Sequence, residues 1–302
     1  MVVRSLIWPY RIFFRNKDSM NSFYNSVQDF IRKIRAIDLK QADASAQILL
    51  ELKQFTGIRH FKVTFRKGSC IYRCRPNEEI DFFGLVDDLK YPPAKRILDF
   101  GRCNLPQQPV FYASEFEWNS FIELMHALDK RVPDNMNAPV TVGEWVLQQD
   151  LEMVVVLNPD NKGTMARYMS LFQSDFDEVI NREPAEEIEG LRLFFHFIAE
   201  AYARSAVDDQ DVYKLTSAYS DIVFGMDRVD GIIYPSVQYH HHGINYALKP
   251  SVLDNKKITL SAVAKFTYLK GRQENGKASF TQLPPGGRLA LSIDQASGII
   301  TW

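Results

Sequence analysis

Residues 109–128, PVFYASEFEWNSFIELMHAL, join a short apolar run to a longer segment with helical periodicity. The apolar run, 109–114, is typical of a buried strand. Ser114 and Glu117 form an S-x-x-E capping box, which predicts that a helix begins directly after the strand. The stretch therefore predicts a strand-to-helix corner at Ser114, and with it a fold that combines β-strands and α-helices.

Upstream of this corner the sequence predicts two helices, a hairpin and an irregular segment. Apolar residues recur every three or four positions within 23–34 and again within 48–55, as in amphipathic helices. The runs FKVTF (61–65) and CIYRCR (70–75) then alternate and are joined by RKGS, which favours a β-hairpin. The proline-containing segment 88–108 resists regular structure and is predicted to be a long loop.

Downstream of the corner, strands and helices follow in blocks. VTVGEWVL and LEMVVVL are typical of strands, and three helical stretches follow at roughly 164–181, 184–206 and 209–225. GIIYPSV is predicted to return to strand, and NYALKP is predicted to pair nearby. The chain is therefore predicted to be α+β. Its predicted parts are a helical lead-in (1–60), a mixed β-sheet core with helices (61–250) and a β-rich C-terminal extension packed on that core (251–302).

The composition of the 302 residues limits the partners of the chain. Its 36 Lys and Arg nearly cancel 37 Asp and Glu, so no field of the whole molecule attracts nucleic acid or anionic membrane, and we expect neither as a partner. The three cysteines include no paired CxxC motifs, which favours reduced thiols over a disulfide framework or a zinc ribbon. Without a recognisable signal peptide or a run of about 18 apolar residues, we expect a cytoplasmic protein.

Glu123 is the first candidate for chemistry. Spacings of four, three and four residues place it on one helical stripe with Phe116, Ser120 and Ala127. Apolar residues occupy the adjacent face, so Glu123 lies close to the boundary of the core. A carboxylate there needs a partner or a ligand, unless its head group reaches water.

Three arginines are candidates for binding phosphate. Arg73 and Arg75 lie two apart in YRCR and would face the same side of a strand, and Arg102 ends the long loop before the FYAS strand. Guanidinium groups suit bidentate recognition of a phosphate or pyrophosphate. The alternative is that each forms an ion pair at the surface.

The three consecutive histidines, 240–242, are a weaker candidate. Neighbouring residues on a strand point to alternate faces, so this run lacks the spacing of a zinc site, and we interpret it as a polar loop. The chain has neither a GxxxxGK[ST] nor a GxGxxG motif, so the sequence does not support a P-loop or a Rossmann site. No metal site is predicted.

Taken in order, these motifs resemble the RES domain family. YRCR, GRCN, PVFYAS, a glutamate one helix later, DGIIYPS and NYALKP follow one another over about residues 70–250. The family's positions would be Arg73, Arg102, Tyr112, Glu123 and Ser236. Where the family usually shows GGRW, this chain has DFGRCN, which keeps open a catalytically inactive module that binds a nucleotide or a partner.

The resemblance implies a fold like that of ADP-ribosyltransferases and NAD as the substrate. Glu123, Arg73 and Tyr112 would be catalytic, and Arg73, Arg102, Tyr112 and Ser236 would bind NAD. The implied reaction is cleavage of the nicotinamide–ribose bond by phosphorolysis or hydrolysis, as in toxins of toxin–antitoxin pairs, and no metal is required. Protein ADP-ribosylation is an alternative. Inorganic phosphate and a small antitoxin protein are implied partners.

Overall fold

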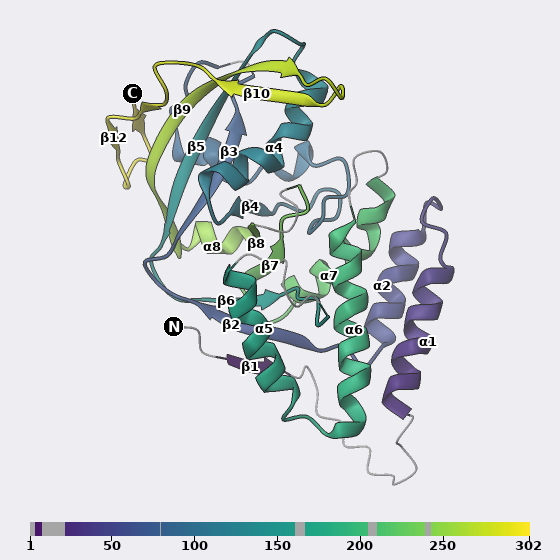
Figure 1. The fold of residues 1–302 in the computed structure, drawn as a ribbon. Coiled ribbons are helices and arrows are strands. Elements are labelled where there is room, and N and C mark those ends of the chain that lie inside the picture. The colour runs from purple at the N-terminus through teal and green to yellow at the C-terminus, as the bar shows by residue number, and fades with distance from the viewer. Residues whose placement is uncertain (1–3, 8–21, 79, 161–166, 205–209, 239–242) are drawn as a thin grey trace.

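The computed structural model describes residues 4–7, 22–78, 80–160, 167–204, 210–238 and 243–302. One large mixed β-sheet runs through them, with helices beside it (Figure 1). In sheet order its strands are β1 (Arg4–Ile7), β2 (His60–Phe65), β6 (Leu151–Val155), β7 (Gly231–Pro235), β8 (Ile244–Leu248), β4 (Phe111–Ser114), β3 (Cys70–Pro76), β5 (Asn137–Leu147), β9 (Ile258–Arg272) and β10 (Ala278–Gln282). The prediction of an α+β protein with a mixed sheet is confirmed.

The remaining elements in the described residues are eight α-helices, two short 3₁₀ helices (Ala94–Arg96 and Gln210–Val212) and three short strands. The helices are α1 (Ser22–Ala36), α2 (Ala44–Gln54), α3 (Val86–Leu89), α4 (Glu117–Arg131), α5 (Arg167–Ile180), α6 (Ala185–Ala203), α7 (Tyr213–Phe224) and α8 (Pro250–Asp254). The short strand β11 (Arg288–Leu289) pairs with β9, whereas β12 (Ser292–Ile293) and β13 (Ile300–Thr301) pair with each other.

The predicted hairpin between the FKVTF and CIYRCR runs is wrong, because the two strands do not pair with each other. Instead β2 pairs with β6 and β3 pairs with β5, so the β2–β3 segment and the β5–β6 segment form one antiparallel ribbon. Phe65 lies opposite Leu151 on one side of its bend. On the other side of the bend Cys70 lies opposite Val146, which is five residues later in the first segment and five residues earlier in the second. The register is therefore unbroken across the bend.

Hydrogen bonds between the two segments, from backbone and side-chain groups, hold the ribbon together at the bend. Gly68 adopts φ +84° there and donates its N–H to the carbonyl of Leu147 at 2.8 Å. The N–H of Lys67 donates to the carboxylate of Asp150 at 2.9 Å, and the Arg66 guanidinium pairs with the same carboxylate. Because the turn at residues 66–68 stays hydrogen-bonded to the β5–β6 segment, it bends the β2–β3 segment without reversing its direction.

Three strands lie between the two halves of this bent ribbon. β7 runs parallel to β6, β8 is antiparallel to β7, and β4 is antiparallel to β8. The prediction that NYALKP pairs nearby is therefore confirmed, and its partners are β7 and β4. β4 meets β3 at the single pair Tyr72–Ser114, after which the two strands diverge.

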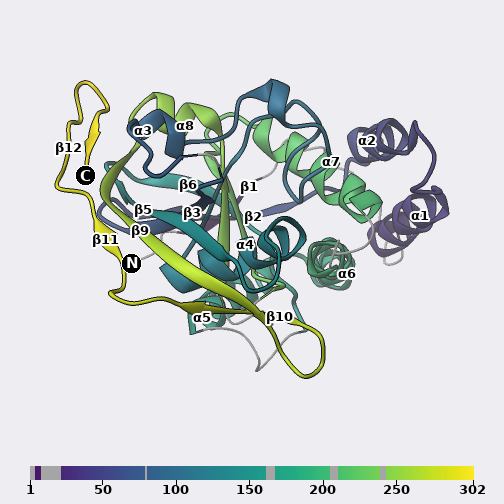
Figure 2. The ribbon, with the colours of Figure 1, turned by 90° about the horizontal axis from the view of Figure 1, so that it is seen from above.

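Helices α1, α2, α6 and α7 form a group at one side of the molecule, away from β9 and β10 (Figure 1 and Figure 2). Aromatic side chains fill this group: Phe30 stacks on Phe55 with ring centroids 4.4 Å apart, and Phe194 packs against both. Burying a side chain of this size contributes roughly 2 to 3 kcal/mol. The helices predicted within 23–34 and 48–55 are confirmed. The three predicted before GIIYPSV are confirmed where the structure describes them; positions 164–166 and 205–209 lie outside the described residues.

Two local predictions are corrected. The lead-in, predicted to be helical, also contains β1, which pairs antiparallel with β2 and so satisfies backbone groups at the edge of the sheet. The capping box is also wrong: α4 begins at Glu117, with Phe116 at its N-cap and no side-chain cap. The hydroxyl of Ser114 donates instead to the Asn245 side chain at 2.8 Å.

The C-terminal segment contributes to the same sheet as the core. β9 pairs with β5 from Asn137 to Leu147, with a bulge between Glu144 and Trp145. The boundaries at residues 60 and 250 stay predictions. Among the described residues, no helix is both long enough and apolar enough to cross a membrane.

Candidate functional site

The structure brings Glu123 and Ser236 into direct contact. Glu123 projects from α4, and its Oε1 accepts a hydrogen bond from the buried Ser236 hydroxyl, which lies 113 residues further along the chain. The Nδ2 of Asn245 donates to the same oxygen at 2.7 Å. A carboxylate from a helix is therefore held by two donors from the ends of neighbouring strands.

A row of polar side chains crosses the sheet below Glu123. Asn245 on β8 lies opposite Ser114 on β4 and opposite Tyr234 on β7. Because side chains alternate along a strand, Tyr112 and Ser236 lie on the same face as this row. Residues on the other face, such as Ile233, Tyr246 and Phe111, are apolar or aromatic and belong to the core, whose rings include the stacked pair Phe65–Tyr246.

Tyr112 ties the row to the loop that carries Arg102. Its hydroxyl donates to Oδ1 of Asn104 at 2.8 Å and accepts a hydrogen bond from the backbone N–H of Cys103 at 2.9 Å. Burial raises the pKa of the Tyr112 phenol well above its ordinary value. Tyr112 is therefore a neutral side chain at physiological pH.

Arg102 lies at the C-terminal end of α6. It is 8% exposed, and its Nη1 donates to the carbonyls of Tyr202 and Arg204, the latter at 3.0 Å. Its Nη2 donates to the hydroxyl of Tyr213 at 3.2 Å. A cation in this place satisfies carbonyls that end a helix and opposes the negative end of its dipole.

Tyr213 and Tyr234 are influenced by the charges of both Arg102 and Glu123. The guanidinium carbon of Arg102 lies 4.9 Å from the ring centroid of Tyr213 and 6.0 Å from that of Tyr234. Burial raises the pKa of both phenols; the charge of Glu123 raises each further, and the charge of Arg102 opposes the rise. Glu123, Arg102 and the two phenols thus share one electrostatic neighbourhood.

Arg73 lies on the opposite face of the sheet from Glu123. Tyr72 faces Ser114, so the next residue along β3 points the other way. Its guanidinium lies 5.1 Å from the ring centroid of Phe111, and its Nη1 donates to the carbonyl of Tyr112 at 2.7 Å, where β3 and β4 diverge. Burial lowers the pKa of Arg73 to about 10.

The three arginines therefore fall in two places. Arg75 shares the face of Arg73, with its guanidinium 4.8 Å from the ring centroid of Phe83, whereas Arg102 lies at the end of α6. Arg73 contacts the backbone of Tyr112, and the hydroxyl of Tyr112 contacts the loop of Arg102. The predicted site residues are linked through Tyr112, but the three guanidiniums do not form one cluster.

Sequence reasoning missed four residues of the site. Asn245 opens the NYALKP motif and Tyr234 lies within GIIYPS, so both were in stretches that had been singled out. Ser114 was interpreted as a helix cap. Tyr213, at the start of α7, carried no signal in the sequence.

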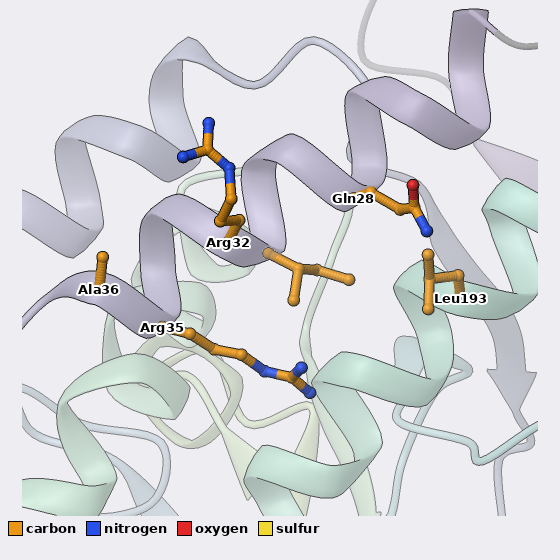
Figure 3. Close-up of a pocket in the computed structure, with 6 residues that line it drawn as sticks. Gln28, Arg32, Arg35, Ala36 and Leu193 are labelled. Atoms are coloured by element: carbon orange, nitrogen blue, oxygen red, sulfur yellow. The ribbon is translucent and has the colours of Figure 1, made fainter.

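A surface cavity of about 470 Å³ lies elsewhere, between α1 and α6 (Figure 3). Its lining includes Arg32 and Arg35, which already pair with Asp29 and Glu200. None of the predicted site residues lines it, so this cavity is separate from the Glu123 site.

The described residues offer no obvious metal centre. No group of three or more His, Cys, Asp or Glu side chains among them is placed to hold a metal ion. The histidine run 240–242 lies outside the described residues. Neither the protein-family models nor the curated proteins with which the chain was compared contain a match to it.

Proposed function

We propose that this chain cleaves the nicotinamide–ribose bond of NAD and belongs with the RES domain proteins and their ADP-ribosyltransferase-like fold. The observation that carries the proposal is the hydrogen bond between Ser236 and Glu123. The resemblance assigns these two residues to one site from separate motifs, 113 positions apart in the chain. The contact between Ser236 and Glu123 is a feature of the structure alone, so it supports the resemblance independently.

In the proposed reaction, the bond between the ribose C1′ and the nicotinamide nitrogen breaks, and its electron pair leaves with nicotinamide. The sugar carbon then has oxocarbenium character, as in glycoside hydrolysis. The carboxylate of Glu123, partly screened from water, stabilises that positive charge. An oxygen of phosphate or water bonds to C1′ and that nucleophile loses a proton, giving ADP-ribose phosphorylated at this carbon or ADP-ribose.

The other residues take roles that follow from their places. Ser236 holds Glu123, and the neutral phenol of Tyr112 lies on the same face, where it lines the pocket for the ribose or nicotinamide. Arg102 acts on the same two phenols as Glu123 and is the arginine we assign to the pyrophosphate. Arg73 acts on the strand that carries Tyr112, through the carbonyl of that residue.

The test is to incubate the purified chain with NAD, with and without inorganic phosphate, and to follow nicotinamide and the ribosyl product by chromatography. We expect release of nicotinamide by the parent and a loss of at least about 100-fold in Glu123→Gln, which keeps the shape and removes the charge. A phosphate requirement identifies phosphorolysis. Equal rates in the parent and the variant would show that Glu123 is not the catalytic carboxylate.

One observation favours a second candidate function. The Nη1 of Arg102 already donates to two backbone carbonyls, which leaves fewer of its N–H groups for a pyrophosphate. A RES-like module that binds a nucleotide or a protein partner without turnover fits this arrangement. NAD binding measured by calorimetry, with no release of nicotinamide, would favour that module over the enzyme, and transfer of ADP-ribose to a protein would identify a transferase.

A further inference from the structure

Both donors to Glu123 bind the same carboxylate oxygen. Ser236 and Asn245 donate to Oε1, and no described residue donates to Oε2. A carboxylate held through one oxygen presents the other oxygen in a fixed direction. The hydrogen bonds to Oε1 thus determine which atom of Glu123 meets a ligand.

The amide of Asn245 has a determined orientation. Its Oδ1 accepts hydrogen bonds from the Ser114 hydroxyl at 2.8 Å and from Nδ2 of Asn119 at 3.3 Å. A flipped amide would place its NH₂ group against Nδ2 of Asn119 and its oxygen against the carboxylate of Glu123, and both of these contacts are repulsive. The Ser114 hydroxyl can donate or accept, so the other two contacts decide the orientation, and Nδ2 faces Glu123.

Asn119 and Gly243 hold α4 above Asn245. Asn119 precedes Glu123 by four residues, so both side chains leave the same face of the helix. The Nδ2 of Asn119 also donates to the carbonyl of Ile244 at 3.0 Å. A Cβ atom at Gly243 would lie 2.6 Å from the Asn119 amide, so a glycine is needed for this close approach.

Asn245 is nearly fully buried, at 3% exposed, and a buried amide is retained only where its hydrogen bonds are made. We infer that Asn245 is a positioning residue: anchored by Ser114 and Asn119, it holds Oε1 of Glu123 and directs Oε2 toward the substrate. This inference rests on the proposed function for the identity of the substrate. The hydrogen-bond geometry itself does not depend on NAD.

The main test compares Asn245→Leu and Asn245→Asp with the parent in NAD cleavage. Asn245→Leu removes the donor at similar volume, and we expect kcat to fall about 100-fold while KM changes less than about threefold, because the amide does not touch NAD. Asn245→Asp places a second carboxylate beside Glu123. Its activity should rise as the pH falls, since the introduced carboxyl group can donate a hydrogen bond once it is protonated, whereas the parent should not gain activity on acidification.

Ser114→Ala serves if either Asn245 variant fails to fold. It removes one hydroxyl, whose hydrogen bond in the described residues goes to Asn245, and we expect kcat to fall several-fold at unchanged KM. Asn77→Leu, at another buried asparagine, is the matched control and should keep the parent's kcat. Unchanged kcat in Ser114→Ala and Asn245→Leu, or parent-like pH dependence in Asn245→Asp, would overturn the inference.

A double-mutant cycle separates this inference from the proposed function. If the parent releases no nicotinamide, the proposed function fails. The coupling between Asn245 and Glu123 can still be measured, because it follows from the urea-unfolding midpoints of the parent, the two single variants and the double variant. We expect the shifts in midpoint caused by Asn245→Leu and Glu123→Ala to be non-additive: the midpoint of the double variant should shift by less than the sum of the two single shifts. Additive shifts would show that Asn245 does not hold Glu123.

Discussion

His60 is buried without charge at the interface between the sheet and the helices. It is 1% exposed in β2, and its Nδ1 lies 2.9 Å from the hydroxyl of Tyr219 on α7. Burial lowers the pKa of His60 to about 4, and the charge of Arg59 contributes in the same direction. The imidazole is therefore neutral in the folded protein over the physiological pH range.

This burial makes the stability of the fold sensitive to mild acid. An unfolded histidine takes up a proton near pH 6.5, but His60 in the fold does so only near pH 4, so its stabilising contribution is complete above pH 6.5 and is lost between these values. We expect a loss of about 2 kcal/mol in its contribution to the free energy of unfolding between about pH 7.5 and 5.0.

Urea unfolding at the two pH values measures this loss. His60→Gln should show a smaller pH dependence than the parent, and His126→Gln, on α4, is the control that should keep it. An equal pH dependence in the parent and His60→Gln would contradict the prediction.

At the scale of elements, the bend of the ribbon depends on one glycine. Gly68 adopts φ +84°, and no neighbouring atom lies within 4 Å of a Cβ added there. Gly68→Ala should therefore lower the free energy of unfolding by about 1 kcal/mol through backbone strain and without a clash. Gly84→Ala is the matched control, because that site is equally open and has no positive φ. Equal losses of stability in the two variants would argue against strain at the bend.

The elements also show what the sequence could predict. Helical periodicity and apolar alternation are local signals, and most of the predicted helices and strands are present. The pairing of β2 with β6 is not local, because RKGS is as compatible with a bend as with a hairpin. Ser114 was misassigned for a similar reason: its hydroxyl satisfies a partner 131 residues away and not the nearby helix.

The candidate site was predictable in part. Motifs placed Glu123 and Ser236 in one site, and the structure brings them into contact. The direction of a side chain, in contrast, depends on strand register, and Arg73 lies on the far face because Tyr72 faces Ser114. Tyr213 joins the site only through the packing of α7, which no local pattern reveals.

At the scale of the whole molecule, the C-terminal segment is part of the main sheet. β9 contributes buried residues such as Leu260 and Val263 and pairs with β5 over eleven residues of that strand. A chain ending at residue 256 would expose the edge of β5 and lose this apolar contact. We expect the truncated chain not to fold cooperatively, as judged by the loss of a thermal transition in circular dichroism.

A truncation that ends at residue 290 is the control for chain length. It keeps β9 and β10 and removes β12 and β13, which form their own two-stranded sheet and contact residues 82–86 through residues 298–302. We expect it to retain a cooperative transition. A cooperative transition in the chain ending at residue 256 would show that the core folds without residues 257–302.

The hydrogen bonds to Glu123 also have a consequence for the order of events during synthesis. The acceptor, Glu123, is synthesised well before its donors, Ser236 and Asn245. The strands next to these donors, β7 and β8, lie between the halves of the bent ribbon. Contacts so distant along the chain form slowly, because long loops must close first. A nascent chain still held in the ribosome at residue 236 therefore carries Glu123 without its donors, and the arrangement is completed only after residue 245 has left the ribosome.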